Sequence, residues 1–199
     1  MSEIKRPKLN IVVIDFETTG FDPIKNEITE VGAVQIDGKT GEITNQFDAL
    51  IKIIGKVPPK IVELTGITDD LLQQHGLPKE LVGEYLKEMC ENSIVVAHNA
   101  SFDLSWAFHQ FGIVPKYYYD TLTISRDLYP DEKSHKLGDI CSRAGIKLEN
   151  AHRAISDTLA CAELLNKQLN KPGVAQNYLN VISGYRGLRF KPENTRKVI

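Results

Sequence analysis

The stretch "IVVIDFETTG" at residues 11–20 decides the fold, because it joins an apolar run to two acids and a turn-forming glycine. Residues 11–14 are typical of a strand that is buried on both faces. Residues i and i+2 of a strand point to the same side, so Asp15 and Glu17 project together while Phe16 faces the other way. Two like charges on one face repel and raise each other's pKa unless a cation lies between them. The alternative interpretation is a strand end that emerges into solvent.

The composition is that of a globular protein of ordinary size. The chain has 199 residues, of which 42% are hydrophobic and 25% charged, with a formal net charge of −2. No stretch approaches the roughly 18 apolar residues that span a bilayer, and "MSEIKRPKLN" at the start lacks the apolar core of a secretory signal, so we expect no membrane partner. Three cysteines without C-x-x-C spacing indicate buried thiols in a reducing compartment. We therefore predict a cytoplasmic protein.

The order of predicted elements indicates an α/β fold. "NEITEVGAVQID" and "GEITNQFDALIK" flank a turn and predict a hairpin after the first strand. A helix in "PKELVGEYLKEMC", a strand in "SIVVAH", a helix in "ASFDLSWAFHQFG" and a strand in "KYYYDTL" follow. Helices in "TISRDLYP", "HKLGDICSRAG" and "AISDTLACAELLNKQL" complete the series. This order predicts a central mixed β-sheet with an antiparallel start, flanked by α-helices.

The two ends of the chain are expected to lie outside this domain. Residues 1–8 form an N-terminal extension, residues 9–170 the domain, and residues 171–199 a C-terminal helix and basic tail. The last 17 residues carry five basic side chains against the single acid Glu193. A basic tail on an acidic body suits contact with phosphates or with a partner protein, and a solvated, frayed terminus is the alternative.

Two further acids stand out by their surroundings. Asp103 follows a buried strand and lies near the start of an apolar helix, beside His98, to which we assign no role. Asp157 lies among small and apolar residues of a helix, where a charge needs a partner. Each has a structural alternative: Asp103 as an acid favoured by the helix dipole, and Asp157 as an exposed helical aspartate.

Taken together, these motifs resemble the DEDD exonucleases, in their DnaQ-like branch with a catalytic histidine. The resemblance covers roughly residues 9–170 and rests on "VIDFETTG", "VAHNASFD" and "AHRAISD". The connecting stretches "IVELTGITDD", "YDTLTISRDLYP" and "SHKLGDICSRAGI" are similar to the proofreading exonuclease domain of PolC-type polymerases, and the epsilon proofreading subunit is also similar. The resemblance implies a ribonuclease H-like fold, which agrees with the predicted order of elements.

The resemblance also implies the catalytic residues. It makes Asp15, Glu17, Asp103 and Asp157 the ligands of two divalent metal ions, Mg²⁺ or Mn²⁺, and His152 the general base. Four converging carboxylates repel one another, and hard dications that prefer oxygen ligands remove that penalty. On a regular helix His152 and Asp157 would lie about 140° apart, so we expect His152 on the approach to the helix. An imidazole is well matched to taking a proton at neutral pH.

Other residues are expected to hold the substrate end. A turn at Thr18, Thr19 and Gly20 would aim backbone N–H groups and a hydroxyl at a terminal 3′-OH, as family members do. In relatives an apolar residue of the segment that holds Leu64 and Ile67 wedges against the terminal base, a contact that tolerates any base. Phe102 is expected in the same pocket and Asn99 near the scissile bond. Ordinary turn, loop or core roles are the alternatives.

The leading functional hypothesis is a 3′→5′ exonuclease acting on single-stranded or frayed DNA ends and releasing nucleoside monophosphates. The first alternative is the same chemistry on RNA or short oligoribonucleotides. The second is an inactive module that binds nucleic acid or a polymerase. The predicted partners are therefore DNA, or RNA, and a replication polymerase, while the oligomeric state stays open.

Overall fold

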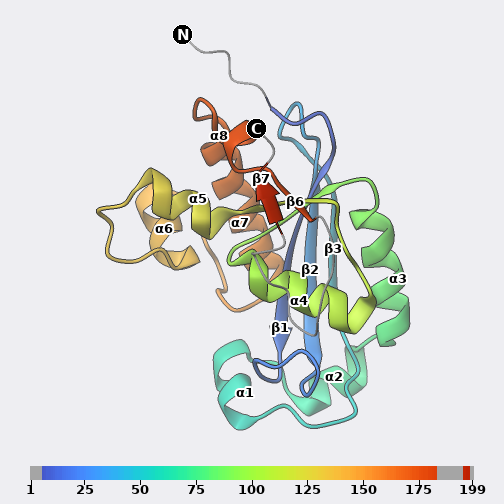
Figure 1. Cartoon of the computed structure of the whole chain (residues 1–199). Coiled ribbons are helices and arrows are strands. Elements are labelled where there is room, and N and C mark those ends of the chain that lie inside the picture. Colours follow the sequence, from blue (N-terminus) through green and yellow to red (C-terminus); the bar gives the residue numbers. More distant parts are fainter. Residues whose placement is uncertain (1–5, 183–194, 198–199) are drawn as a thin grey trace.

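The computed structural model describes residues 6–182 and 195–197, and a seven-stranded mixed sheet lies at its centre (Figure 1). The strands of this sheet are β1 (Ile11–Thr18), β2 (Ile28–Ile36), β3 (Ile43–Leu50), β4 (Ile94–Ala97), β5 (Tyr117–Asp120), β6 (Asn180–Ile182) and β7 (Thr195–Lys197). They lie in the order β3-β2-β1-β4-β5-β6-β7. β1, β2 and β3 pair antiparallel, whereas β4 pairs parallel with both β1 and β5. The predicted mixed sheet with an antiparallel start is confirmed.

Helices cover both faces of the sheet. They are α1 (Pro59–Thr65), α2 (Asp69–His75), α3 (Lys79–Cys90), α4 (Ala100–Phe111), α5 (Thr121–Leu128), α6 (Leu137–Ala144), α7 (Ala154–Leu169) and α8 (Val174–Asn177). α3 and α4 pack their apolar sides on one face, and α5 and α7 pack theirs on the other. α1 and α2 lie beneath the carboxyl end of β1 in Figure 1, where the chain passes from β3 to α3.

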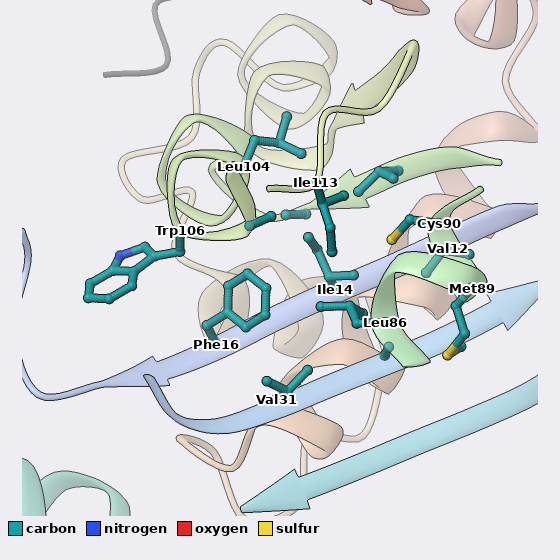
Figure 2. Close-up of a cluster of buried hydrophobic side chains, with 14 of the residues drawn as sticks. Val12, Ile14, Phe16, Val31, Leu86, Met89, Cys90, Leu104, Trp106 and Ile113 are labelled. Atoms are coloured by element: carbon teal, nitrogen blue, oxygen red, sulfur yellow. The ribbon is translucent and has the colours of Figure 1, made fainter. Parts of the chain in front are cut away.

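The alternation of side chains along β1 assigns its two faces to different partners. Val12, Ile14 and Phe16 point into the cluster that α3 and α4 cover, and Figure 2 shows these side chains together with Trp106 as members of this cluster. Ile11 and Val13 point to the opposite face and pack in the cluster that contains α7. Because side chains alternate, Asp15 and Glu17 share the face of Ile11 and Val13. The two acids therefore continue the face that α7 covers.

Two short strands near the C-terminal end of the chain, β6 and β7, belong to the central sheet. β6 pairs antiparallel with β5, and β7 pairs with β6, so both strands extend the central sheet. Residues 1–5 of the expected extension, and residues 183–194 and 198–199 of the basic tail, lie outside the described residues. All three cysteines are buried free thiols, as predicted. Among the described residues, every helix is too short or too polar to cross a bilayer.

Candidate active site

The carboxyl end of β1 extends beyond its parallel neighbour. β4 pairs with β1 from Ile11 through Val13 and then ends, whereas β2 stays paired with β1 as far as Thr18. Asp15 and Glu17 therefore stand past the last β1–β4 pair, at an open edge of the sheet. Parallel strands of α/β sheets commonly carry ligand sites at this carboxyl end.

α4 brings Asp103 to the same edge. The helix starts just after β4, and its N-cap, Asn99, has the left-handed φ of 73° that an asparagine tolerates well. Asp103 lies in the first turn and is almost completely buried. Burial raises the pKa of Asp103 well above its ordinary value, while a hydrogen bond from the backbone N–H of Phe16 acts in the opposite direction. This hydrogen bond ties Asp103 to the residue between Asp15 and Glu17.

His152 and Asp157 come from the start of α7. The helix begins at Ala154, so His152 stands on its approach, as the sequence predicts. The backbone N–H of His152 donates to Oδ2 of Asp157 over 3.1 Å, and the φ of His152 is +66°. Ligand atoms of Glu17, His152 and Asp157 all lie within 4.8 Å of one another. A strand end and a helix start thus present two carboxylates and an imidazole to one point.

The acids at this edge raise one another's pKa. Burial raises the pKa of Asp15 well above its ordinary value, and the charges of Asp103, Asp157 and Glu17 raise it further. Burial and the charge of Asp157 raise the pKa of Glu17 to about 7. The pKa of Asp157 is also raised by burial. A concentration of acids with raised pKa values in a partly closed site is typical of a functional centre.

The sequence did not reveal that Glu30 fixes the start of α7. Glu30 has no exposed surface, and its Oε1 accepts hydrogen bonds from Nε of Arg153 at 2.9 Å and from Nη2 at 2.6 Å. Its Oε2 accepts a bond from the backbone N–H of Ala154 over 2.8 Å. Both partners directly follow His152. The available signal was a lone acid inside the apolar run "ITEVGAV" of β2.

Gly32 lets α7 approach β2 closely. It lies two residues after Glu30, and therefore on the same face of the strand. A Cβ atom at Gly32 would stand 2.4 Å from the carbonyl group of Ala154, which is backbone and cannot swing away. Glu30 holds the first residues of α7, and the missing side chain at Gly32 sets their distance from the sheet.

The segment after β1 forms a closed turn. The hydroxyl of Thr18 donates to the carbonyl oxygen of Gly20 over 2.6 Å. The backbone N–H of Thr19 donates to the carbonyl oxygen of Glu27 over 2.9 Å. Thr19 Oγ1 accepts a bond from the backbone N–H of Glu27. Because the hydroxyl of Thr18 is already donated within the turn, the substrate contacts of this segment stay a prediction that rests on its place beside Glu17.

The remaining expected substrate residues differ in exposure. Leu64 is 50% exposed at the end of α1, whereas Ile67 is completely buried against Val57 and Leu72. The structure thus gives Ile67 a packing role, and its contact with a base stays a prediction. Phe102 is partly buried and packs on Trp106, and Asn99 is exposed.

Comparison with known proteins decides the family. The profile of the RNase T exonuclease family matches residues 12–165. The chain belongs to this exonuclease family. The chain is 40% identical over 164 residues to the PolC-type DNA polymerase III of Bacillus subtilis and 38% identical over 164 residues to that of Clostridium perfringens. These matches cover 79% and 80% of the chain but 11% of each polymerase, so the chain spans about a ninth of the relatives' length.

Solved structures agree on the fold. The chain superimposes on Exonuclease X in complex with 5′ overhanging duplex DNA with a TM-score of 0.68 at 23% identity, covering 82% of this chain and 93% of that one. E. coli Exonuclease I in complex with a dT13 oligonucleotide gives a TM-score of 0.68 at 19% identity, covering 82% and 41%. A 3′-exonuclease that recognises a histone mRNA stem-loop gives 0.71 at 16% identity, covering 96% and 70%. The fold is ribonuclease H-like, as the resemblance implied.

Proposed function

We propose that the chain is a metal-dependent 3′→5′ exonuclease that hydrolyses the terminal phosphodiester bonds of single-stranded or frayed DNA and releases nucleoside monophosphates. The observation that carries the proposal is the meeting of Glu17, His152 and Asp157 within 4.8 Å, beside Asp15 and Asp103. The similarity to PolC-type DNA polymerases supports DNA as the substrate and a replication polymerase as a partner.

The donor set fits divalent cations. Asp15, Glu17, Asp103 and Asp157 offer oxygen ligands, which Mg²⁺ and Mn²⁺ prefer. Burial raises the pKa of all four acids, and the charges of neighbouring acids raise it further, so a bound cation would offset both effects. We assign these four acids to holding two such ions, which when bound polarise the scissile phosphate and neutralise the charge that develops on it.

The chain's own groups supply the remaining chemistry. His152 takes the proton from the attacking water, and its position is fixed by its backbone bond to Asp157 and by the bonds of Glu30 to Arg153 and Ala154. The turn that follows β1 positions the 3′ end, and the exposed Leu64 packs on the terminal base.

A labelled-strand assay tests the proposal. DNA and RNA oligomers of one sequence, labelled at the 5′ end, are incubated with Mg²⁺, with Mn²⁺ or with EDTA. We expect a ladder of shortened labelled DNA with either ion and none with EDTA. Immediate release of the label as a mononucleotide would reverse the polarity. Shortening of RNA alone would establish the exoribonuclease alternative, and binding without cleavage of either polymer would establish the inactive module.

Glu30 is expected to act as a positioning residue. Glu30→Gln removes the charge that faces Arg153 and places an amide near the N–H of Ala154. We expect turnover to fall about 10–100-fold with little change in KM, because the group that orients a catalytic residue is disturbed while substrate contacts remain. The free energy of unfolding should fall by about 1–3 kcal/mol. Steady-state kinetics and urea unfolding measure both quantities.

Asp48→Asn provides the matched control for Glu30→Gln. Asp48 pairs with Gly32 across the β2–β3 ladder and lies in the electrostatic field of Arg153. Its substitution should leave turnover within about twofold of the unmodified protein, as expected for a site outside the hydrogen-bonded cluster. If the Glu30→Gln and Asp48→Asn proteins have equal turnover, Glu30 is not a positioning residue of the proposed active site.

A further inference from the structure

A groove opens beside the proposed active site and is not explained by the residues assigned above. Its volume is about 840 Å³, and its lining includes His152 and Asp157. From there it follows the end of β4, α5 and the segment that leads into α6. This volume is in the upper part of the range of about 300–1,000 Å³ that small-ligand pockets occupy. The groove is therefore continuous with the proposed active site and has space for more than the reacting group.

Cationic side chains line this groove. Arg126, Lys133 and Lys136 are exposed and belong to its wall. Among the described residues, none of the ion pairs involves any of these three side chains. The acids of the lining are Asp157, assigned to the metal ions, and Asp139, which accepts a hydrogen bond from Ser134. Three unpaired cations in one groove contrast with the net charge of −2 of the whole chain.

Partly buried His98 fixes the wall that carries the lysines. Its Nε2 is bonded to the carbonyl oxygen of His135 at 2.8 Å, and its Nδ1 to Oγ1 of Thr121 at 2.9 Å. The ring of His135 is in turn bonded to Ser125 over 3.0 Å. His135 lies between Lys133 and Lys136 in the chain. These bonds therefore attach the segment 133–136 to the end of β4, the strand that leads to Asp103. His98, to which the sequence gave no role, thus sets the distance from the lysines to the proposed active site.

We propose that Arg126, Lys133 and Lys136 bind the phosphodiester backbone of a single strand on the 5′ side of the bond that is cleaved. The inference rests on the proposed function and names the part of the substrate that lies beyond the terminal nucleotide. The turn after β1 and helix α1, which carries Leu64, are assigned to the 3′ end and lie at the lower end of the sheet in Figure 1, whereas α5 and α6 lie to its side. The rest of the strand leaves the site toward the groove, where unpaired cations meet its phosphates.

The experiment compares two substrates at several salt concentrations. One is a single-stranded DNA 12-mer, and the other is the p-nitrophenyl ester of thymidine 5′-monophosphate, which has one phosphodiester and no flanking phosphates. The variant combines Arg126→Gln, Lys133→Gln and Lys136→Gln. The control combines Lys39→Gln, Lys52→Gln and Lys87→Gln, which makes the same change of net charge at exposed positions outside the groove.

The expected result is a change in salt dependence that is confined to the DNA strand. Three lost phosphate contacts should reduce the slope of log kcat/KM against log salt by about 2, since each contact on a single strand contributes about 0.7. The unmodified protein should then lose about 20-fold more kcat/KM than the variant between 50 and 200 mM salt. Hydrolysis of the p-nitrophenyl ester should be the same for both proteins, and the control should keep the full slope.

Four outcomes would overturn the inference. If the variant keeps the slope of the unmodified protein, the groove does not bind the strand, and the proposed function stands. If the variant loses activity on both substrates equally, the three cations act on folding or at the reaction centre. If the unmodified protein hydrolyses neither substrate, the proposed function fails and this inference fails with it. A variant that cleaves DNA normally but no longer binds a polymerase would assign the groove to a protein partner.

Discussion

Replacing Asp15 with asparagine should abolish nucleotide release and at the same time stabilise the metal-free protein. Asp15 is one of the four proposed metal ligands, so its loss should lower turnover by about 10³-fold or more. This effect exceeds the 10–100-fold cost of disturbing a residue that only orients a catalytic group. The same change removes one member of a set of carboxylates that repel one another. Each kcal/mol of relieved repulsion should raise the Tm by about 2–4 °C for a chain of this length.

The gain in stability should depend on pH in a defined direction. A pKa that is raised in the folded state means that this state binds the proton more tightly than the unfolded chain does. Such a group stabilises the folded protein fully when the pH is below its pKa in the unfolded chain. This stabilisation is lost as the pH rises through its pKa in the folded state, which is about 7 for Glu17. Asp15→Asn should therefore raise the Tm of metal-free protein more at pH 8 than at pH 5.

Calorimetry and a nuclease assay at both pH values check this prediction. Asp70→Asn, at an exposed position on α2, is the control and should change stability by less than about 0.5 kcal/mol. An Asp15→Asn protein that still releases nucleotides at the normal rate would exclude Asp15 from the catalytic ligand set. A fall in Tm at pH 8 would show that some other charge already balances the acids.

Replacing His152 should separate catalysis from metal binding. His152→Asn is the appropriate variant, because asparagine tolerates the positive φ of this position and cannot act as a base. We expect turnover to fall by about 10²–10⁴-fold, the usual contribution of general base catalysis. Binding of Mn²⁺, followed by calorimetry, should persist because the four carboxylates remain.

The dependence of the residual rate on pH distinguishes a base from a structural residue. Loss of a general base should remove the limb of the kcat–pH profile that rises with pH, whereas a packing defect would lower the rate equally at all pH values. His75→Asn, on the exposed surface of α2, is the control. If His152→Asn loses Mn²⁺ binding, His152 is a ligand and not the base.

Local sequence patterns predicted the part of the fold that depends on periodicity. The apolar run before Asp15 and the alternation after it predicted both faces of β1, because a strand has a period of two. The 140° separation of His152 and Asp157 on a helix predicted that His152 precedes α7, and the structure confirms this. These inferences needed only the geometry of one element.

Features that depend on contacts between distant elements were not predictable. The bonds of Glu30 to Arg153 and Ala154 join residues more than 120 positions apart, and nothing near Glu30 in the chain indicates the partner. The burial of Ile67 depends on packing against Val57 and Leu72, which a motif does not encode. The pairing of β6 with β5 is likewise a long-range contact that places part of the expected tail in the sheet.

The close contact at Gly32 restricts which residues can replace this glycine. A position without a side chain usually tolerates exchange with alanine, but here one added carbon would collide with the main chain of α7. The helix would have to shift outward, and His152 and Asp157 would move with it, away from the strand that carries Asp15. An inherited change at Gly32 would therefore disturb the proposed active site from a distance, although this residue has no chemical group to offer the reaction.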